Sequence, residues 1–175
     1  MMDAKEAKRR VEALLFSSDE PLSIERLKAC SGVPARYVRE AISALAMEYD
    51  EQERAFQLEE VAGGFQLYTR KEYSDVVAKL YKGKRTSRLS RPALETLAII
   101  AFRQPVTKAV IESVRGVNVD GVVSTLLERD LIQVVGKAKG MGGPLLYGIT
   151  KEFLRYFHLK SMDELPQVDE LRGMG

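Results

Sequence analysis

The residue types that carry most enzyme chemistry are scarce in this chain of 175 residues, which has one cysteine, Cys30, and one histidine, His158. A single thiol cannot form an intrachain disulfide, and zinc sites of the cysteine and histidine type need several such ligands. Cys30 lies in a segment of apolar periodicity, which favours a buried, unreactive thiol. A Ser-His-Asp triad would have to use His158, so an unrecognised hydrolase is kept only as a third alternative.

One glycine-rich stretch, Gly140-Met141-Gly142-Gly143, has the composition of a phosphate-binding loop. In such loops a lysine and a hydroxyl residue follow and open a helix, whose first amides hold the phosphate. Here Pro144 and an extended segment follow instead. The acidic residues are scattered, and no spacing singles out two of them as an acid and base pair. The sequence therefore predicts no catalytic site, no metal site and no cofactor.

The composition is that of a globular protein. Charged residues make up 30% of the chain and apolar residues 45%, which is too apolar for a disordered chain. The longest apolar run, residues 97–102, is far shorter than the roughly 18 residues that a membrane helix needs. The N-terminus is charged from Asp3 onward and lacks the pattern of a signal peptide. We therefore expect a cytoplasmic protein without a membrane partner.

Positive charge is concentrated in the middle of the chain. Residues 82–91 contain five basic and no acidic residues, whereas the net charge of the whole chain is +2. The segment lacks apolar periodicity, which is typical of a linker between domains. It is either a solvated linker or a nonspecific contact with DNA phosphates. The basic side chains available for such a contact are Lys82, Lys84, Arg85 and Arg88.

Apolar spacing in the first half of the chain predicts three helices followed by a hairpin. Residues 4–16 have the three-and-four spacing of an amphipathic helix. A second helix begins after Ser23, which serves as its N-cap, and ends at Gly32; a third helix extends to Tyr49. Residues 56–69 then alternate in hydropathy around two glycines, as a hairpin does. This is the order of elements in a winged helix-turn-helix domain.

The same order of elements recurs 84 residues further along the chain. Eight positions of the first half pair with residues that are identical or alike in chemistry. The pairs comprise prolines that end a loop, hydroxyl N-caps, glycines that end the second helix and apolar residues that pack the helices. They are Pro21 and Pro105, Leu22 and Val106, Ser23 and Thr107, Leu27 and Ile111, Gly32 and Gly116, Val33 and Val117, Val38 and Val122, and Ile42 and Leu126.

The remaining segments complete the predicted architecture. A second hairpin pairs residues 131–135 with 145–149, and its glycine-rich connection is interpreted as a mobile wing. Two further helices, residues 72–81 and a last helix carrying Phe153, Tyr156 and Phe157, are interpreted as packing elements. The predicted fold class is mainly α with small β-hairpins (α+β), arranged as two tandem winged helix-turn-helix domains. The expected divisions are an N-terminal domain at 1–81, a linker at 82–91, a C-terminal domain at 92–165 and a flexible tail at 166–175.

A winged helix often reads DNA by placing its third helix in the major groove. In the second domain that helix, residues 118–129, contains two acids and one base, and Asn118 is almost its only groove-reading residue. The first domain offers Arg36 and Arg39, but acidic residues follow closely. DNA binding normally needs several uncompensated cations. A winged-helix DNA-binding transcriptional regulator is therefore the alternative function, behind a protein that binds other macromolecules.

Two apolar residues fall on otherwise polar faces of the opening helices. At roughly 100° per residue from Leu94, Ile99 lies at about 140°, near Arg103, so we expect it outside the core. Phe16 has the same position on the first helix, measured from Val11. Each is either a solvated side chain, a contact between domains or part of a partner interface.

Longer motifs resemble a known family. Residues 89–107 (LSRPALETLAIIAFRQPVT) and 115–121 (RGVNVDG) resemble the bacterial segregation and condensation protein B (ScpB) family. So do residues 12–16 (EALLF), 20–22 (EPL) and 144–148 (PLLYG), and the resemblance spans about residues 11–165. One departure is Gly143, because the family commonly has Gly-Arg-Pro before the last strand; another is Ile149, where a threonine is usual. No role for an arginine at the base of the wing is carried over to this chain.

The resemblance implies a non-enzymatic homodimer that binds the kleisin subunit ScpA and, through it, the head domains of an SMC protein. The complex is condensin-like, associates with the nucleoid, and condenses and partitions chromosomes during cell division. In that family the kleisin is held largely by the second domain, and dimer contacts come largely from the first. We therefore expect Phe16 in the dimer interface. The residues expected to contact the kleisin are Ile99, Phe102, Arg103 and Val119.

Overall fold

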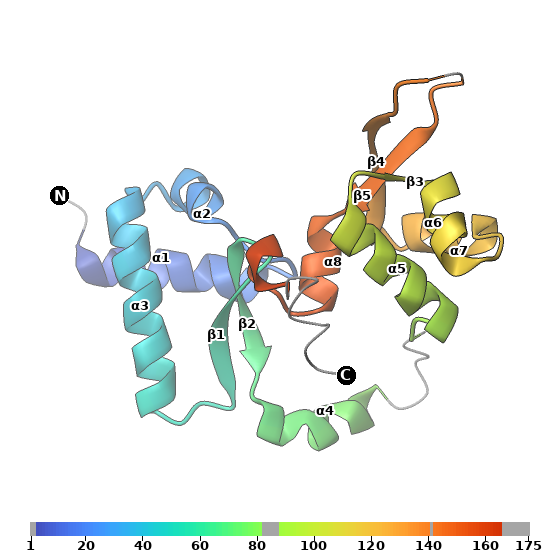
Figure 1. The fold of residues 1–175 in the computed structure, drawn as a ribbon. Helices are drawn as coiled ribbons and strands as arrows, with labels where there is room; N and C mark the ends of the chain where they lie inside the picture. Colours follow the sequence, from blue (N-terminus) through green and yellow to red (C-terminus); the bar gives the residue numbers. More distant parts are fainter. Residues whose placement is uncertain (1–2, 82–87, 141, 166–175) are drawn as a thin grey trace. The chain divides into compact units, whose positions relative to one another are not determined.

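The computed structural model describes residues 3–81, 88–140 and 142–165 (Figure 1). The chain divides into two compact units, Met1–Arg85 and Thr86–Gly175. Each unit contains three helices followed by an antiparallel hairpin, which is the winged helix-turn-helix order. The predicted fold class, mainly helical with small antiparallel sheets in two tandem domains, is confirmed.

The first unit contains the three predicted helices and the predicted hairpin. The side chain of Ser23 caps α2 by accepting a hydrogen bond of 3.2 Å from the backbone N–H of Arg26. Gly32 ends α2 in the left-handed region, at a φ of 69°, and its N–H bonds to the carbonyl of Lys28. The elements are α1 (Ala4–Ser17), α2 (Ile24–Ser31), α3 (Ala35–Glu51), β1 (Phe56–Val61) and β2 (Gly64–Thr69).

Apolar side chains from all three helices meet in the core of the first unit. Val11 and Leu15 of α1, Leu27 of α2 and Leu45 of α3 are at most 1% exposed. The hairpin covers this core through partly buried side chains, among them Phe65. Phe65 also exchanges two backbone hydrogen bonds of 2.9 Å with Leu22, so that the segment before α2 is fastened to the hairpin. The helices and the wing therefore form one packed unit.

Polar bonds at the C-terminal end of α3 join the helices to the hairpin. The Tyr49 hydroxyl donates a hydrogen bond of 2.8 Å to the Glu12 carboxylate on α1. The Tyr49 ring meets the Phe56 ring edge to face, with centroids 5.0 Å apart. Burial, reinforced by the bond to Glu12, raises the pKa of Tyr49 above its ordinary value. Next to it, Arg70 from the end of β2 forms an ion pair with Asp50.

The second unit repeats this plan with an additional short strand. Strand β3 (Val106–Thr107) pairs with β5 (Leu145–Ile149), which also pairs with β4 (Ile132–Lys137), so the three-stranded sheet has the order β3-β5-β4. The sequence pattern did not indicate β3. The β4 and β5 strands form the wing, with a register shift between Val134 and Gly136. The elements are α5 (Arg91–Arg103), β3 (Val106–Thr107), α6 (Lys108–Arg115), α7 (Asp120–Glu128), β4 (Ile132–Lys137), β5 (Leu145–Ile149), α8 (Lys151–Tyr156) and η2 (Met162–Glu164).

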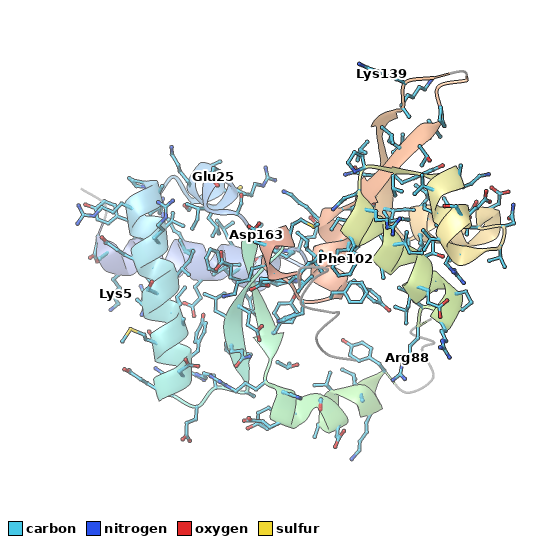
Figure 2. The ribbon with its side chains drawn as sticks, in the orientation of Figure 1. Lys5, Glu25, Arg88, Phe102, Lys139 and Asp163 are labelled. Atoms are coloured by element: carbon cyan, nitrogen blue, oxygen red, sulfur yellow. The ribbon has the colours of Figure 1, made fainter. Side chains whose placement is uncertain are left out.

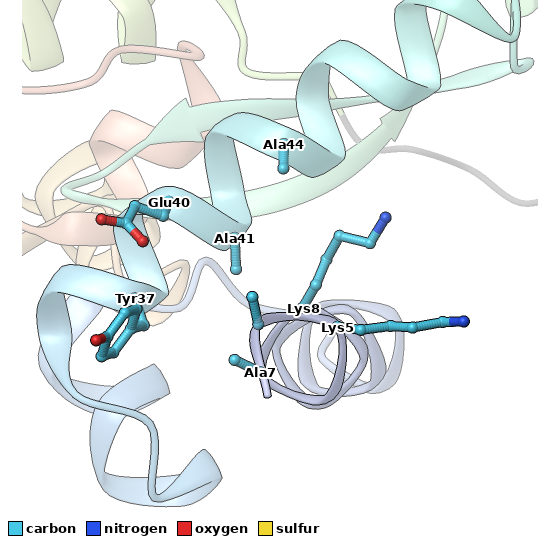
Figure 3. Close-up of a pocket in the computed structure, with 8 residues that line it drawn as sticks. Lys5, Ala7, Lys8, Tyr37, Glu40, Ala41 and Ala44 are labelled. Carbon is cyan, nitrogen blue, oxygen red and sulfur yellow. The ribbon is translucent and has the colours of Figure 1, made fainter. Parts of the chain in front are cut away.

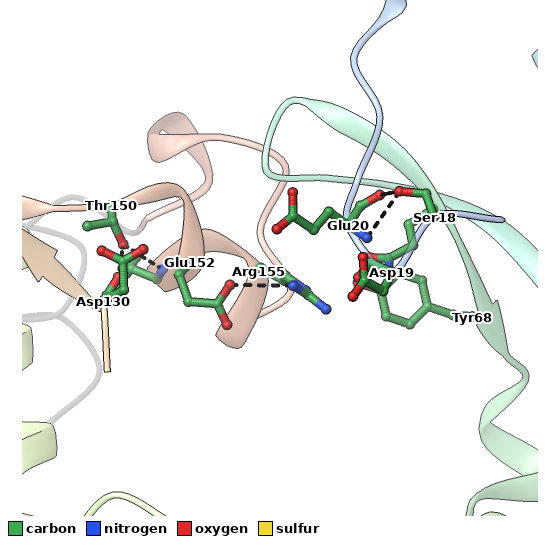
Figure 4. A network of polar contacts seen from close by, with 10 residues as sticks. Ser18, Asp19, Glu20, Tyr68, Asp130, Thr150, Glu152 and Arg155 are labelled. Carbon is green, nitrogen blue, oxygen red and sulfur yellow. Dashed lines mark hydrogen bonds and ion pairs between the residues drawn. The ribbon is translucent and has the colours of Figure 1, made fainter. Parts of the chain in front are cut away.

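Polar caps hold the end of the second unit together (Figure 4). The Thr150 hydroxyl accepts a bond of 3.2 Å from the N–H of Phe153 at the start of α8, and it donates to the carbonyl of Asp130. Phe153 is buried in the core, whereas Tyr156 and Phe157 are 45% and 38% exposed. The packing role predicted for this helix therefore holds for Phe153, and the other two rings stay at the surface.

The repeat holds up to the end of the second helix and then shifts by one residue. Gly32 and Gly116 have the same backbone angles, a φ of 69° and a ψ of 11°. After them α3 begins three residues later, at Ala35, but α7 begins four residues later, at Asp120. The additional residue puts Val123 in the core.

Three of the predicted pairs lie after this shift and are therefore out of register, including Ile42 and Leu126, since Leu126 aligns with Ala41. Val33 is fully buried while Val117 is 56% exposed, so these two residues do not occupy equivalent places. Val38 is fully buried while Val122 is only partly buried, and Val123 is 4% exposed. The pattern of identical residues could not reveal this shift at Val38, because residues 122 and 123 of the second unit are both valines.

Two expectations for the first unit are also wrong. The segment expected to pack as a helix at 72–81 forms η1 (Lys71–Tyr73) and α4 (Ser74–Leu80), and neither element has a buried residue. Leu80 is 77% exposed. Cys30, expected to be buried, is exposed. The reason is that α2, only eight residues long, buries only Leu27 and Ser31.

Replacing Gly64 by alanine should destabilise the first unit. The added Cβ would lie 2.9 Å from backbone carbon atoms of Pro21 and Leu22, which cannot move without breaking the bridge to Phe65. We expect a loss of about 1–3 kcal/mol, the usual cost of overpacking. The measurement is urea unfolding followed by circular dichroism. Gly121→Ala is the control, because no atom lies within 4 Å of its Cβ; equal effects of the two changes would contradict the prediction.

Tyr49→Phe should lower the free energy of unfolding of the first unit at neutral pH. It should also make that free energy depend less on pH in alkaline solution. Loss of the bond to Glu12 should cost about 1 kcal/mol. The raised pKa keeps Tyr49 neutral in the folded chain, whereas tyrosine in the unfolded chain ionises near pH 10. The contribution of Tyr49 is thus complete below pH 10 and declines as the pH rises further. The free energy of unfolding, measured with urea at pH 7.5 and at pH 11, should differ less between parent and variant at the higher pH. An equal difference at both pH values would contradict the prediction.

Candidate partner-binding surfaces

The last turn of α1 presents Phe16 to solvent, with 82% of the residue exposed. Phe16 lies at the rim of a groove of about 320 Å³ between α1, the end of α3 and the hairpin. The groove is mostly apolar, although Arg9 and Glu12 contribute charge at its edge. Its other lining residues are Ala13, Tyr49, Phe56 and Leu67. A large exposed ring beside an apolar groove is a typical arrangement for a contact between proteins.

The orientation of α5 differs from the one expected from its apolar pattern. Its buried residues are Ala93, Thr96, Leu97, Ile100 and Ala101. Leu94, the zero point of the predicted helical angles, is 42% exposed, whereas the polar residue Thr96 is fully buried. Thr96 is accommodated because its hydroxyl accepts a hydrogen bond of 2.5 Å from the Arg115 guanidinium.

Of the four residues expected to contact the kleisin, two lie at the surface and two pack against or within the core. Arg103, the last residue of α5, is exposed. Phe102 beside it is partly exposed (Figure 2). Ile99 is only partly buried but packs against the core, so the expectation that it lies outside the core is corrected. Val119 is 1% exposed. It is a core residue because the turn after Gly116 directs it inward, and its side chain is not available to a partner.

A stripe along the outer face of α5 was not anticipated from the sequence. Leu94, Ala98 and Phe102, four residues apart, are exposed or partly exposed on one side of the helix. We call these three residues the α5 stripe. A second set of exposed apolar residues, Val110 and Val114 on α6 with Val117 after it, was also missed. The available signal was the spacing of four, but periodicity could not tell an outer face from a core face.

The third helix of the second unit is poorly suited to DNA. Asp120 begins α7, where it forms an ion pair with Lys108 and accepts a hydrogen bond of 2.9 Å from the Asn118 side-chain amide. The bond to Lys108, then the bond to Asn118, lowers the pKa of Asp120 and keeps it negatively charged. Asn118 is thereby held by an acid, and that acid would repel a phosphate backbone.

The basic residues proposed for nonspecific DNA contacts are only partly visible. Lys82, Lys84 and Arg85 lie outside the described residues, whereas Arg88 is described and exposed. Lys139 in the connection between β4 and β5 is also exposed, at the tip of the wing (Figure 2). No contact with DNA follows from exposure alone, so this remains a prediction.

A groove between the N-terminal half of α1 and α3 has a volume of about 430 Å³ (Figure 3). Small side chains form its walls, among them Ala7 and Ala41. The charged residues at its rim bind partners on the protein itself: Lys8 forms an ion pair with Glu48, and Glu40 with Arg36 at 3.0 Å. These charges stabilise the surface and do not form an acid and base pair directed into the groove.

The parts of the chain that the structure describes contain neither a metal-binding cluster nor a membrane-spanning helix. Within residues 3–81, 88–140 and 142–165, no group of three or more His, Cys, Asp or Glu side chains could hold a metal ion. None of the helices described there combines the length and the hydropathy required to cross a bilayer.

Comparisons with known proteins agree on one family. The family model for segregation and condensation complex subunit ScpB matches residues 9–168. Segregation and condensation protein B of Geobacillus thermodenitrificans is 49% identical over 168 residues, which cover 95% of this chain and 80% of the relative. The protein of the same name from Moorella thermoacetica is 45% identical over 161 residues, covering 92% and 82%.

Two solved structures are similar to the chain. ScpB from Mycobacterium tuberculosis is 38% identical, with a TM-score of 0.45, and the match covers 90% of this chain and 98% of that one. A dimer of an ScpB N-terminal domain, crystallised with an ScpA peptide, matches 43% of this chain and 95% of its own at 39% identity, with a TM-score of 0.41. Because the family model and both sequence relatives extend over nearly the whole chain, the chain belongs to the ScpB family.

Proposed function

We propose that this chain is a non-enzymatic accessory subunit of a bacterial condensin-like SMC-kleisin complex. It binds the kleisin ScpA as a homodimer and acts in chromosome condensation and partition during cell division, in the cytoplasm and on the nucleoid. The observation that carries this proposal is the 49% identity to an ScpB protein over 95% of the chain. The exposed apolar surfaces of both units support it, because a subunit that assembles with others needs such surfaces.

The first unit, residues 1–81, is the proposed dimerisation domain, with Phe16 at its centre. Aromatic side chains that are exposed in an isolated chain and buried on association commonly dominate interfaces. In a contact with two-fold symmetry, the same patch on each copy provides both the projecting ring and the groove that receives it. Phe16 and the groove walls at Tyr49 and Phe56 supply these two parts.

The second unit, residues 92–165, is the proposed kleisin-binding domain. The α5 stripe, with Arg103 beside it, replaces the surface inferred from the sequence. Phe102 and Arg103 are kept, Leu94 and Ala98 are added, and the core-packed residues Ile99 and Val119 are removed. A stripe with residues four apart matches the apolar face of a helix or an extended segment. Arg103 at its end could pair with an acidic residue of the partner.

A winged-helix DNA-binding transcriptional regulator remains the alternative function. The distribution of charge in the described residues argues against it. The acid at the start of α7 is paired within the unit, and the described basic residues are distributed over several elements. Specific DNA binding depends on cations that meet several phosphates at once. A weak contact through the segment containing Lys82, Lys84, Arg85 and Arg88 is compatible with a role on the nucleoid.

Phe16→Asp should convert the dimer into a monomer without unfolding the first unit. A charge in the contact would have to be desolvated, whereas in the monomer Phe16 is already in solvent. Light scattering coupled to size-exclusion chromatography measures the molar mass. Met47→Asp is the matched control, because Met47 is 62% exposed on α3 and does not line the Phe16 groove. A dimeric Phe16→Asp variant would refute the placement of the interface.

Phe102→Asp should weaken ScpA binding at least tenfold and leave the dimer intact. The assay is titration of a fluorescent ScpA fragment with the full chain at roughly 150 mM salt, a concentration at which nonspecific DNA binding is weak. Leu145→Asp, at a 40% exposed position on β5, is the control and should bind like the parent. A parallel titration with duplex DNA tests the alternative: tight DNA binding without ScpA binding would exclude the proposed function.

A further inference from the structure

The outer face of α6 carries a row of exposed valines. Val110, Val114 and Val117 are 40%, 46% and 56% exposed. Val110 and Val114 are one turn apart on the helix, and Val117 follows directly after the glycine that ends it. Ile111, the next residue after Val110, is turned about 100° around the helix and is fully buried in the core. We call the three valines the α6 stripe.

All three charged residues of α6 are held by groups of their own unit. Lys108 forms its ion pair with Asp120, and the Glu112 carboxylate accepts a bond of 3.2 Å from the N–H of Val119. Arg115 donates to the Pro92 carbonyl at 2.9 Å, in addition to its bonds with Thr96 and Glu95. The exposed residues between or directly beside the valines are uncharged: Ala109, Ser113, Gly116 and Asn118. In a chain with 30% charged residues, the valines of α6 are therefore next to uncharged residues and to charges that are already paired, although the paired Lys108 side chain is 41% exposed.

The first unit shows that the fold does not require valine at these places. Its α2 has the same length, the same type of N-cap and the same glycine end as α6. Arg26 and Cys30 occupy the positions that correspond to Val110 and Val114. Both residues are exposed, and Leu27 fills the core as Ile111 does. The two helices thus share their inner face and differ in the outer one, which points to a binding role specific to the second unit.

The size of the α6 stripe indicates what covers it. Two valines on a helix about 12 Å long, with a third just after it, cannot supply the contact area of roughly 800 Å² per partner that a stable dimer interface buries. A second copy of the chain would therefore not be held there. A long partner chain that also contacts another surface can use so small a patch, because the first contact raises the effective concentration for the second. The α5 helix, with its own stripe, packs directly against α6.

We infer that the α6 stripe binds a short, uncharged apolar segment of the kleisin, in addition to the kleisin contact at the α5 stripe. The inference rests on the proposed function and adds a second docking site on the same unit. The absence of free charge on α6 favours a partner segment that is apolar along the face it presents, because a charged side chain there would lose its hydration without gaining a partner.

The test transfers the polar character of α2 onto α6. In Val110→Arg/Val114→Ser, arginine matches Arg26 and serine replaces the thiol of Cys30 with a hydroxyl of similar size, so the helix should fold as α2 does. Val134→Arg is the matched control, with a similar exposure of 46% in the same unit. Val117→Lys repeats the test outside the helix. Each full-length variant is titrated against ScpA, its molar mass is measured by light scattering, and its thermal unfolding is followed by circular dichroism.

We expect the double variant and Val117→Lys to bind ScpA at least tenfold more weakly, with the dimer and the melting curve unchanged, and Val134→Arg to bind like the parent. Parent-like ScpA binding by both stripe variants would overturn the inference and leave the proposed function standing. Monomeric stripe variants with normal ScpA binding would overturn it as well, because a second copy would then cover the stripe. A parent chain that does not bind ScpA would overturn the proposed function together with the inference.

Discussion

The turn that ends the second helix of each unit sets the direction of the third helix, and the packing of the unit depends on it. Gly32 and Gly116 take up the left-handed conformation there, which other residues adopt only at a cost. Once the chain has turned, Leu27 or Ile111 can meet the third helix in the core. One additional residue after Gly116 was enough to bury Val119 and expose Val117, because the following helix began one position later.

The charged residues of the second unit are arranged to satisfy one another and leave apolar surfaces open. Arg115 is the clearest case, since it bonds to Glu95 and Thr96 and so connects α6 with α5. Surface ion pairs of this kind contribute little to stability. Their consequence here is geometric, because the pairs hold the charged groups of Glu95, Lys108 and Arg115 beside the apolar stripes of the two helices. A DNA reader would need the opposite arrangement, with free cations on the outer face.

The two units show how one fold can acquire different surfaces. The positions that make the fold, the N-caps Ser23 and Thr107 and the buried pair Leu27 and Ile111, are alike in both. The outer residues are under no such constraint, and they differ: Phe16, at 82%, is the most exposed ring among the described residues of the first unit, whereas the second unit exposes rows of aliphatic residues on α5 and α6. Two docking surfaces of different shape suit a subunit that binds itself and another protein.

The sequence by itself determined the helices, the hairpins and their tandem order, because N-caps, helix-ending glycines and apolar periodicity act through neighbouring residues. Exposure of Phe16 could also be foreseen. Only the tertiary structure decided which face of α5 is covered, that Thr96 is buried against Arg115, and that α4 has no buried residue. The physical reason is that periodicity tells which side chains share a face, whereas burial depends on what the rest of the chain brings to that face.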